Sequence, residues 1–216
     1  MKKLVIFDID GTLTDSVSLY HKVVIDALQR MGIGEIDTDF YHYKYHTDSY
    51  TLKFNYENFF NKPITDKLML QFEHILEEEL KKYPPVQEIS GAKECVVSIL
   101  KSDVAIAFAT GSLPKPAILK LEQCDIWHDQ NLIATSKISF DRETFVLQAI
   151  EDAKNYFNIE YFEKIYSVGD GIWDFQTAKR LNLEFIGIGN KQKEALLHLG
   201  CKTHFEDLTK LAPYLI

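Results

Sequence analysis

Two aspartates that directly follow a buried apolar run constrain this chain more than any other feature. Leu4–Phe7 is continuously apolar, as in a strand of a parallel sheet, and Asp8 and Asp10 follow at once. Asp10-Gly11 could also form the turn of a β-hairpin, but a hairpin requires a second strand after Gly11. The residues after Asp15 have helical spacing instead, with one stripe formed by Val17, Tyr20, Val24, Ala27, Leu28 and Met31. We therefore predict a strand that ends in an active-site loop.

Composition limits the classes of protein that the chain can represent. Its 216 residues are 46% hydrophobic, which is enough for a packed core. The net charge of −8 argues against nucleic acid as a partner, because phosphate-backbone binding needs a basic face. No apolar run is long enough to span a membrane, and Asp8 and Asp10 interrupt any signal sequence after Met1-Lys2-Lys3. We expect a cytoplasmic monomer that contacts neither nucleic acid nor membrane.

Three cysteines are widely spaced and lack the pairing typical of a zinc site. They are Cys95, Cys124 and Cys201. Each lies in an apolar or helical context, which indicates free thiols in a reducing compartment rather than disulfides or a catalytic nucleophile.

Residues 16–85 have a helical pattern and lack strand-like runs. Nine aromatic residues lie between Asp37 and Asn61 and can form a small core: Phe40, Tyr41, Tyr43, Tyr45, Tyr50, Phe54, Tyr56, Phe59 and Phe60. Thr65 is placed to cap a helix that ends before Tyr83-Pro84-Pro85, because a residue that precedes proline disfavours the helical conformation. We predict that residues 16–85 form an inserted helical domain.

From residue 86 onward, strands and helices alternate. The apolar runs predict strands at 104–109, 132–134, 164–168, 184–188 and 202–205, with helices between them. This alternation is typical of a doubly wound, three-layer, Rossmann-like α/β fold with a parallel sheet. The core domain would comprise residues 1–15 and 86–216.

Three of the predicted strands end in polar residues. The residues are Asp8 and Asp10, Thr110 and Ser112, and Asp170 and Asp174. The carboxyl ends of parallel strands share one edge of the sheet, so these side chains should surround one crevice. Four carboxylates would repel one another unless a cation neutralised them, and a set of hard oxygen ligands favours Mg²⁺ over zinc.

This combination suits phosphoryl transfer. One carboxylate can attack phosphorus to form an acyl phosphate, while another protonates the leaving oxygen and later activates water. Thr110 and the backbone N–H groups of Gly111 and Ser112 could hold the phosphate oxygens. A protein cation is still needed to complete this phosphate site.

The same residues resemble the motifs of the haloacid dehalogenase superfamily of phosphohydrolases. Asp8–Asp15 is similar to the first motif, Ala109–Ser112 to the second, and Gly169–Asp174 to the fourth. The resemblance implies that Asp8 is the nucleophile, Asp10 the general acid/base and Thr110 a phosphate ligand. It implies that Mg²⁺ is bound by Asp8, the backbone carbonyl of Asp10, Asp170 and Asp174. The acid at Asp10 favours phosphate esters, because the dehalogenases proper lack it.

The third motif matches less well, since the family usually has a lysine, often before a proline, at the start of the helix that precedes the fourth motif. Arg142 holds that helix-start position, and Lys137 lies five residues earlier. We favour Arg142 as the phosphate-binding cation, because its planar guanidinium can donate two hydrogen bonds to phosphate oxygens. Lys137 is the alternative.

The resemblance also identifies residues 16–85 as a helical cap of the C1 type, which closes over the site and selects the substrate. Lys44, His46, Lys53 and His21 are candidate substrate contacts, and Trp173 is a candidate wall of the site. The expected function is a Mg²⁺-dependent phosphatase that acts on a small phosphorylated metabolite. The alternatives are a phosphomutase of the same superfamily, similar to β-phosphoglucomutase, a phosphonate hydrolase with a Schiff-base lysine at Lys44 or Lys53, and a non-catalytic binding protein.

Overall fold

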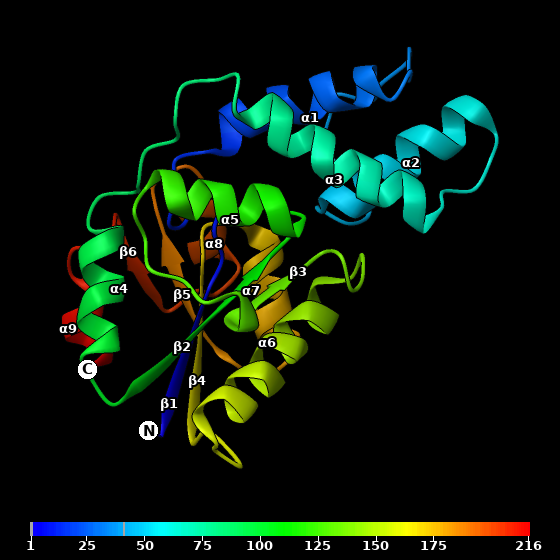
Figure 1. Ribbon diagram of the computed structural model, residues 1–216. Coiled ribbons are helices and arrows are strands. Elements are labelled where there is room, and N and C mark those ends of the chain that lie inside the picture. Colours follow the sequence, from blue (N-terminus) through cyan, green and yellow to red (C-terminus); the bar gives the residue numbers. More distant parts are fainter. Residues whose placement is uncertain (1, 41) are drawn as a thin grey trace.

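A six-stranded parallel sheet forms the centre of the molecule, as the computed structural model of residues 2–40 and 42–216 shows (Figure 1). Its strand order is β3-β2-β1-β4-β5-β6, and every neighbouring pair is parallel. The strands are β1 (Lys3–Phe7), β2 (Val104–Thr110), β3 (Ile133–Thr135), β4 (Lys164–Gly169), β5 (Glu184–Ile188) and β6 (Thr203–Phe205). The doubly wound α/β fold predicted from the sequence is therefore confirmed.

Helices cover both faces of the sheet and bury most of its central strands. Residues of α4, α5 and α9 pack with Val5 and Phe7 on one face, whereas α6 packs on Leu4 and Ile6 on the other. This two-sided burial explains why β1 and β2 are apolar without alternation. The helices after the cap range are α4 (Ala92–Leu100), α5 (Pro114–Gln123), α6 (Arg142–Phe157), α7 (Ile172–Arg180), α8 (Lys193–His198) and α9 (Leu211–Leu215), with a 3-10 helix η1 (Gln130–Leu132) before β3.

Three further helices lie together above the carboxyl ends of the strands (Figure 1). They are α1 (Val17–Arg30), α2 (Asp48–Phe60) and α3 (Asp66–Leu80), and they fall within the range predicted for the cap. They enclose an apolar cluster that includes Leu28, Leu52, Phe72 and Leu76 and that also contains Leu113, which directly precedes α5. The Thr65 hydroxyl accepts a hydrogen bond from Leu68 N, which confirms the predicted helix cap. Of the nine aromatic residues, Tyr41 lies outside the described residues.

Several local details differ from the sequence prediction. Helix α9 was not predicted, because five residues that include a proline give little periodicity. Ser16 and Asp141 directly precede α1 and α6 and are of residue types that commonly cap helices, but neither side chain bonds a helix N–H group. The Ser16 hydroxyl bonds the Asp10 carboxylate instead. For Ser16, a hydrogen bond to Asp10 thus takes the place of a bond to the N-terminus of α1.

The cysteines are free, as predicted. Burial raises the pKa of the Cys95 thiol to about 12 and that of Cys124 to about 11, so neither is a thiolate nucleophile at neutral pH. Within the described ranges, each helix is too short or too polar to cross a lipid bilayer.

Candidate active site

The sheet positions the catalytic candidates through its three central strands. Asp8 follows β1, and its N–H donates to Val168 O of β4 at 2.9 Å. Gly11 then turns the chain away with a φ of +80°, and a Cβ atom there would lie 2.3 Å from an Asp170 carboxylate oxygen. Only glycine permits this approach of the first loop to the β4 loop.

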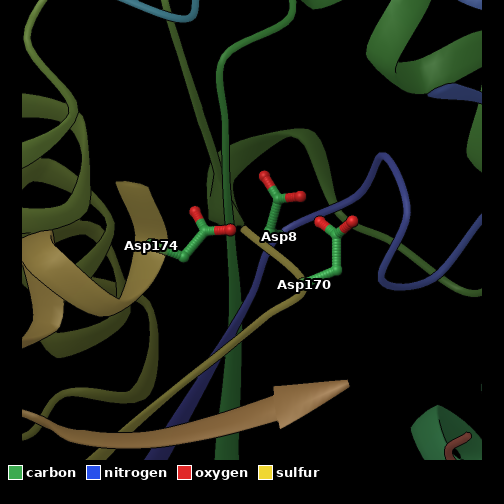
Figure 2. Close-up of side chains that lie close together, drawn as sticks. All are labelled: Asp8, Asp170 and Asp174. Atoms are coloured by element: carbon green, nitrogen blue, oxygen red, sulfur yellow. The ribbon is translucent and has the colours of Figure 1, made fainter. Parts of the chain in front are cut away.

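Asp8, Asp170 and Asp174 converge at the ends of β1 and β4 (Figure 2). One carboxylate oxygen from each lies within 4.8 Å of the others. Burial, followed by the neighbouring negative charge of Asp174, raises the pKa of Asp8 well above its usual value, although Arg142 opposes the shift. The same two causes raise the pKa of Asp170 to about 7. The cluster holds more negative charge than the protein alone stabilises.

Arg142 is the protein cation next to this cluster. It begins α6, and its Nη1 lies 3.1 Å from Asp8 Oδ1 and 2.7 Å from Asp174 Oδ1. Lys137, the alternative from the sequence, does not reach the site. Its side chain is 54% exposed, and its ammonium lies 3.9 Å from Glu73 of α3. The alternative is therefore wrong on geometry, because the loop after β3 directs Lys137 to a separate surface hollow.

A matched pair of variants tests this assignment. For the phosphate ester hydrolysis that the sequence predicts, we expect Arg142→Ala to lower kcat/KM by roughly 10²–10³-fold, since Arg142 would be a charged donor to the transferred phosphoryl group. Lys137→Ala should stay within about twofold of wild type, as expected for a surface change. Steady-state kinetics on the same ester would decide, and equal losses in both variants would contradict the assignment.

A buried lysine that the sequence analysis did not identify binds Asp10. Lys120 of α5 is fully buried, and its Nζ lies 2.7 and 2.6 Å from the two Asp10 oxygens. It also donates to Ser112 Oγ at 2.7 Å and lies 3.6 Å from the centre of the Tyr20 ring. Burial alone would raise the pKa of Asp10. The positive charge of Lys120 and the hydrogen bonds from Lys120, Ser16 and Ser112 outweigh this effect and lower the pKa overall. Asp10 is thus held as a carboxylate, apart from the Asp8 cluster.

Spacing along α5 could have revealed Lys120. Its neighbours at positions 116, 117 and 121 are all buried, so Lys120 lies on the apolar face of the helix. A lysine at such a position needs a buried acidic partner.

The phosphate-binding candidates lie at the end of β2 as predicted, but Ser112 makes hydrogen bonds within the protein instead of pointing its N–H group to a ligand. Thr110, Gly111 and Ser112 all line the same cavity as Asp8. However, Ser112 N donates to Thr110 Oγ1 at 3.1 Å, and the Ser112 hydroxyl donates to Asp10 at 2.9 Å. Ser112 therefore orients its neighbours, and Thr110 and Gly111 remain the candidates to contact a phosphate.

The chemistry of the donor set fits Mg²⁺. Asp8, Asp10, Asp170 and Asp174 carry four negative charges when ionised, whereas Arg142 and Lys120 supply two positive ones, which leaves two uncompensated. The three clustered carboxylates are hard oxygen ligands, which a divalent cation of this kind prefers. Asp8, Asp170 and Asp174 would hold the ion.

The cavity extends from these residues to the predicted cap and has a volume of about 210 Å³. Among the candidate contacts from the sequence, His21, His46 and Trp173 line it. The two lysines do not: Lys53 pairs with Glu57 within α2, and Lys44 lines an adjacent hollow.

Comparison with known proteins gives one decisive match. The model of the haloacid dehalogenase-like hydrolases matches residues 5–188, which include every catalytic candidate described above. The chain belongs to the haloacid dehalogenase-like hydrolase family. No curated protein matches the chain in sequence.

Solved structures of this family share the fold at low sequence identity. A putative β-phosphoglucomutase from Bacteroides vulgatus is 20% identical, with a TM-score of 0.69, over 98% of this chain and 86% of the other. CbbY from Rhodobacter sphaeroides, solved in complex with phosphate, is 13% identical with a TM-score of 0.72, over 98% and 96%. A hydrolase from Pseudomonas syringae is 23% identical with a TM-score of 0.71, over 98% and 96%.

In this member of the haloacid dehalogenase-like hydrolases, one buried aspartate joins α1 and α2 to the second motif. Asp48 Oδ2 accepts hydrogen bonds from Leu113 N at 2.8 Å and from the Tyr20 hydroxyl at 2.6 Å. Asp48 N donates to Gly111 O at 2.9 Å. Burial raises the pKa of Asp48 to about 6, although the Lys120 charge and these hydrogen bonds oppose the shift. Its charge is therefore unfavourable in the folded state.

Asp48→Asn tests this cost through its pH dependence. The folded state binds the proton more tightly than the unfolded state, whose pKa is near 3.8, so wild-type stability falls as pH rises from about 4 to about 6. Above pH 6 the cost is about 3 kcal/mol. The amide can still accept both hydrogen bonds, so Asp48→Asn should melt several degrees higher than wild type at pH 8 and about equally at pH 4. A melting temperature that is lower at both pH values would contradict this account.

Proposed function

We propose that the protein is a Mg²⁺-dependent phosphatase that hydrolyses a small phosphorylated metabolite through an aspartyl phosphate on Asp8. The observation that carries this proposal is the separation of two carboxylates at the end of β1. Asp8 faces Arg142 and the acidic cluster, whereas Asp10 is bound by Lys120. A nucleophile and a proton-transfer group require different surroundings, and the Lys120 pair favours the carboxylate form of Asp10, which is the form that accepts a proton from water.

The residues divide the reaction as follows. Thr110 and Arg142 bind oxygens of the phosphoryl group and orient the phosphorus toward Asp8. An Asp8 oxygen attacks phosphorus and the bond to the ester oxygen breaks. Asp10 is a carboxylate beside Lys120, so it must first take up a proton from solvent, which it then donates to the ester oxygen. Asp10 then takes a proton from a water molecule that attacks the aspartyl phosphate, which releases inorganic phosphate and restores Asp8. Mg²⁺ on Asp8, Asp170 and Asp174 would neutralise charge on the phosphoryl oxygens.

A phosphomutase is the second candidate, because the similar structures include a putative β-phosphoglucomutase. It would use the same aspartates but transfer the phosphoryl group back to a sugar instead of to water. A phosphonate hydrolase is less well supported, because its Schiff-base lysine would have to come from Lys44 or Lys53, and neither lines the cavity.

A screen of phosphorylated metabolites with and without Mg²⁺ tests the proposal. A phosphatase should release inorganic phosphate from at least one ester, and EDTA should abolish the release. A phosphomutase would convert a sugar monophosphate into its isomer with little phosphate release. Binding of metabolites without turnover of any of them would support a non-catalytic protein.

A further inference from the structure

We propose that the substrate is a phosphate monoester whose leaving group is a single uncharged planar ring, and not a sugar or a second phosphate. This inference rests on the proposed function, because it concerns the group that leaves when Asp8 attacks. It depends on three properties of the cavity: its position relative to Asp10, the hydrogen bonds of its hydroxyl groups, and the absence of cap cations from the described lining.

The position of Asp10 defines where the leaving group lies. The group that protonates the ester oxygen must lie within hydrogen-bond reach of it, so the leaving group occupies the space beside Asp10. The cavity of about 210 Å³ contains both Asp8 and Asp10 in its wall and continues between α1 and α2. An apolar cavity of about 150 Å³ is enough to bind benzene, so this space suits a phosphoryl group attached to one ring.

The hydroxyl groups that the cap contributes to this cavity already have partners within the protein. The Tyr20 hydroxyl donates to Asp48, and the Tyr43 hydroxyl donates to Asp37 O. Thr51 donates to Thr47 O, and Thr47 Oγ1 accepts from Tyr50 N. Three of these four hydroxyl groups thus donate within the protein. A sugar would find few free donors for its own hydroxyl groups on this wall, and unpaired buried polar groups are costly.

Apart from the Asp48 carboxyl, the remaining cap surface of the cavity is apolar or aromatic. Val17, Val24 and Phe40 contribute to it. Phe40 and His21 are stacked with their ring centres 4.1 Å apart, and His46 and Trp173 are stacked at 4.4 Å. Flat faces of this kind favour a planar ring over a puckered, hydroxylated one.

The described cap residues of the cavity wall, from the range 16–85, supply no lysine or arginine for a second phosphate. Burial lowers the pKa of His21 and of His46, so both imidazoles are neutral at pH 7. Lys191 lines the cavity from the core, but it is 65% exposed and lies 3.6 Å from Asp15.

The adjacent hollow contains cations but lacks the catalytic aspartates. Lys44 and Arg180 line it, and it meets the cavity at His46, Arg142 and Trp173. Neither Asp8 nor Asp10 lies in its wall. A leaving group placed there could not receive a proton from Asp10.

The test compares esters of primary alcohols, which have similar intrinsic reactivity. The substrates are benzyl phosphate, cyclohexylmethyl phosphate, glucose 6-phosphate and fructose 1,6-bisphosphate, each with Mg²⁺. We expect kcat/KM for benzyl phosphate to exceed that for glucose 6-phosphate by at least about tenfold. Cyclohexylmethyl phosphate should fall between them, because it is apolar but not planar.

Two single-residue variants test whether the cavity wall causes this substrate preference. Phe40→Ala should reduce the ratio of kcat/KM for benzyl phosphate to that for glucose 6-phosphate about tenfold. Phe59→Ala, an exposed aromatic residue of α2 outside the cavity, is the matched control and should leave the ratio unchanged. If Lys44→Met and Lys191→Met selectively lowered activity on the bisphosphate while that substrate was preferred, a second phosphate site would exist.

The outcomes separate this inference from the proposed function. Hydrolysis that favours glucose 6-phosphate or the bisphosphate would overturn the inference and leave the phosphatase intact. If no ester were hydrolysed, calorimetry with benzylphosphonate would decide. Binding that Phe40→Ala weakens about tenfold would support the ligand class without the phosphatase, and no binding would overturn both.

Discussion

Asp8→Asn is expected to reduce Mg²⁺-dependent phosphate release by roughly four orders of magnitude or more, because the amide cannot form the acyl phosphate. The structure also predicts that this loss does not come from unfolding. Asp8 is buried beside Asp174 and Asp170, whose charges repel its own. A neutral amide removes that repulsion, so the melting temperature in EDTA should equal or exceed that of the wild type.

Two measurements complete this test. Acid-quenched wild-type protein should retain label from a ³²P-labelled ester, whereas Asp8→Asn should not. Asp103→Asn makes the same chemical change at an exposed position and should keep full activity. Undiminished turnover by Asp8→Asn would rule out the proposed mechanism.

Lys120→Met is expected to destabilise the protein and to lower kcat by roughly 10²-fold or more. The lysine is fully buried, and Asp10 is 20% exposed, so the ion pair is largely shielded from water. Removing one partner of a buried pair leaves an uncompensated charge, and the residual exposure of Asp10 places the cost near the lower end, at about 3 kcal/mol. This cost corresponds to a fall in Tm of roughly 6–12 °C. The Asp10 carboxylate would also lose the group that binds both of its oxygens, and proton transfer would suffer.

A double-mutant cycle separates stability from catalysis. Lys120→Met combined with Asp10→Asn leaves no unpaired charge, so the double variant should be more stable than Lys120→Met alone but should remain inactive. Lys115→Met, on the exposed face of the same helix, is the control and should change Tm little. If Lys120→Met melted with wild-type Tm, the ion pair would contribute nothing to stability.

Regular patterns made most of the core predictable. The apolar runs before Asp8 and Thr110 each correspond to a strand, because a strand buried on both faces is apolar along most of its length. The strand before Asp170 follows the same pattern less strictly, since it contains the buried Ser167. The Pro114 start of α5 and the Thr65 cap of α3 follow from local backbone chemistry. The proposed cap boundaries at residues 16 and 85 rest on the change in pattern from helical to alternating.

The cations were less predictable, because the partner of a charged side chain depends on distant residues. The helix-start position favoured Arg142 over Lys137, but only the contacts show that Arg142 reaches Asp8 and that Lys137 lies beside Glu73. Lys120 is 110 residues from Asp10 along the chain. The two residues meet because α5 packs next to the loop that follows β1.

The sequence alone predicts the kind of fold and the kind of chemistry, because apolar periodicity and carboxylates at strand ends are local properties of the chain. It determined that Asp8 and Asp10 follow one strand and that two other strands end in polar residues. Only the tertiary structure decided which cation faces each aspartate and which cap groups remain available to a ligand. Those choices depend on burial and on hydrogen bonds between segments far apart in the sequence, since a buried charge or hydroxyl must find its partner wherever packing places one.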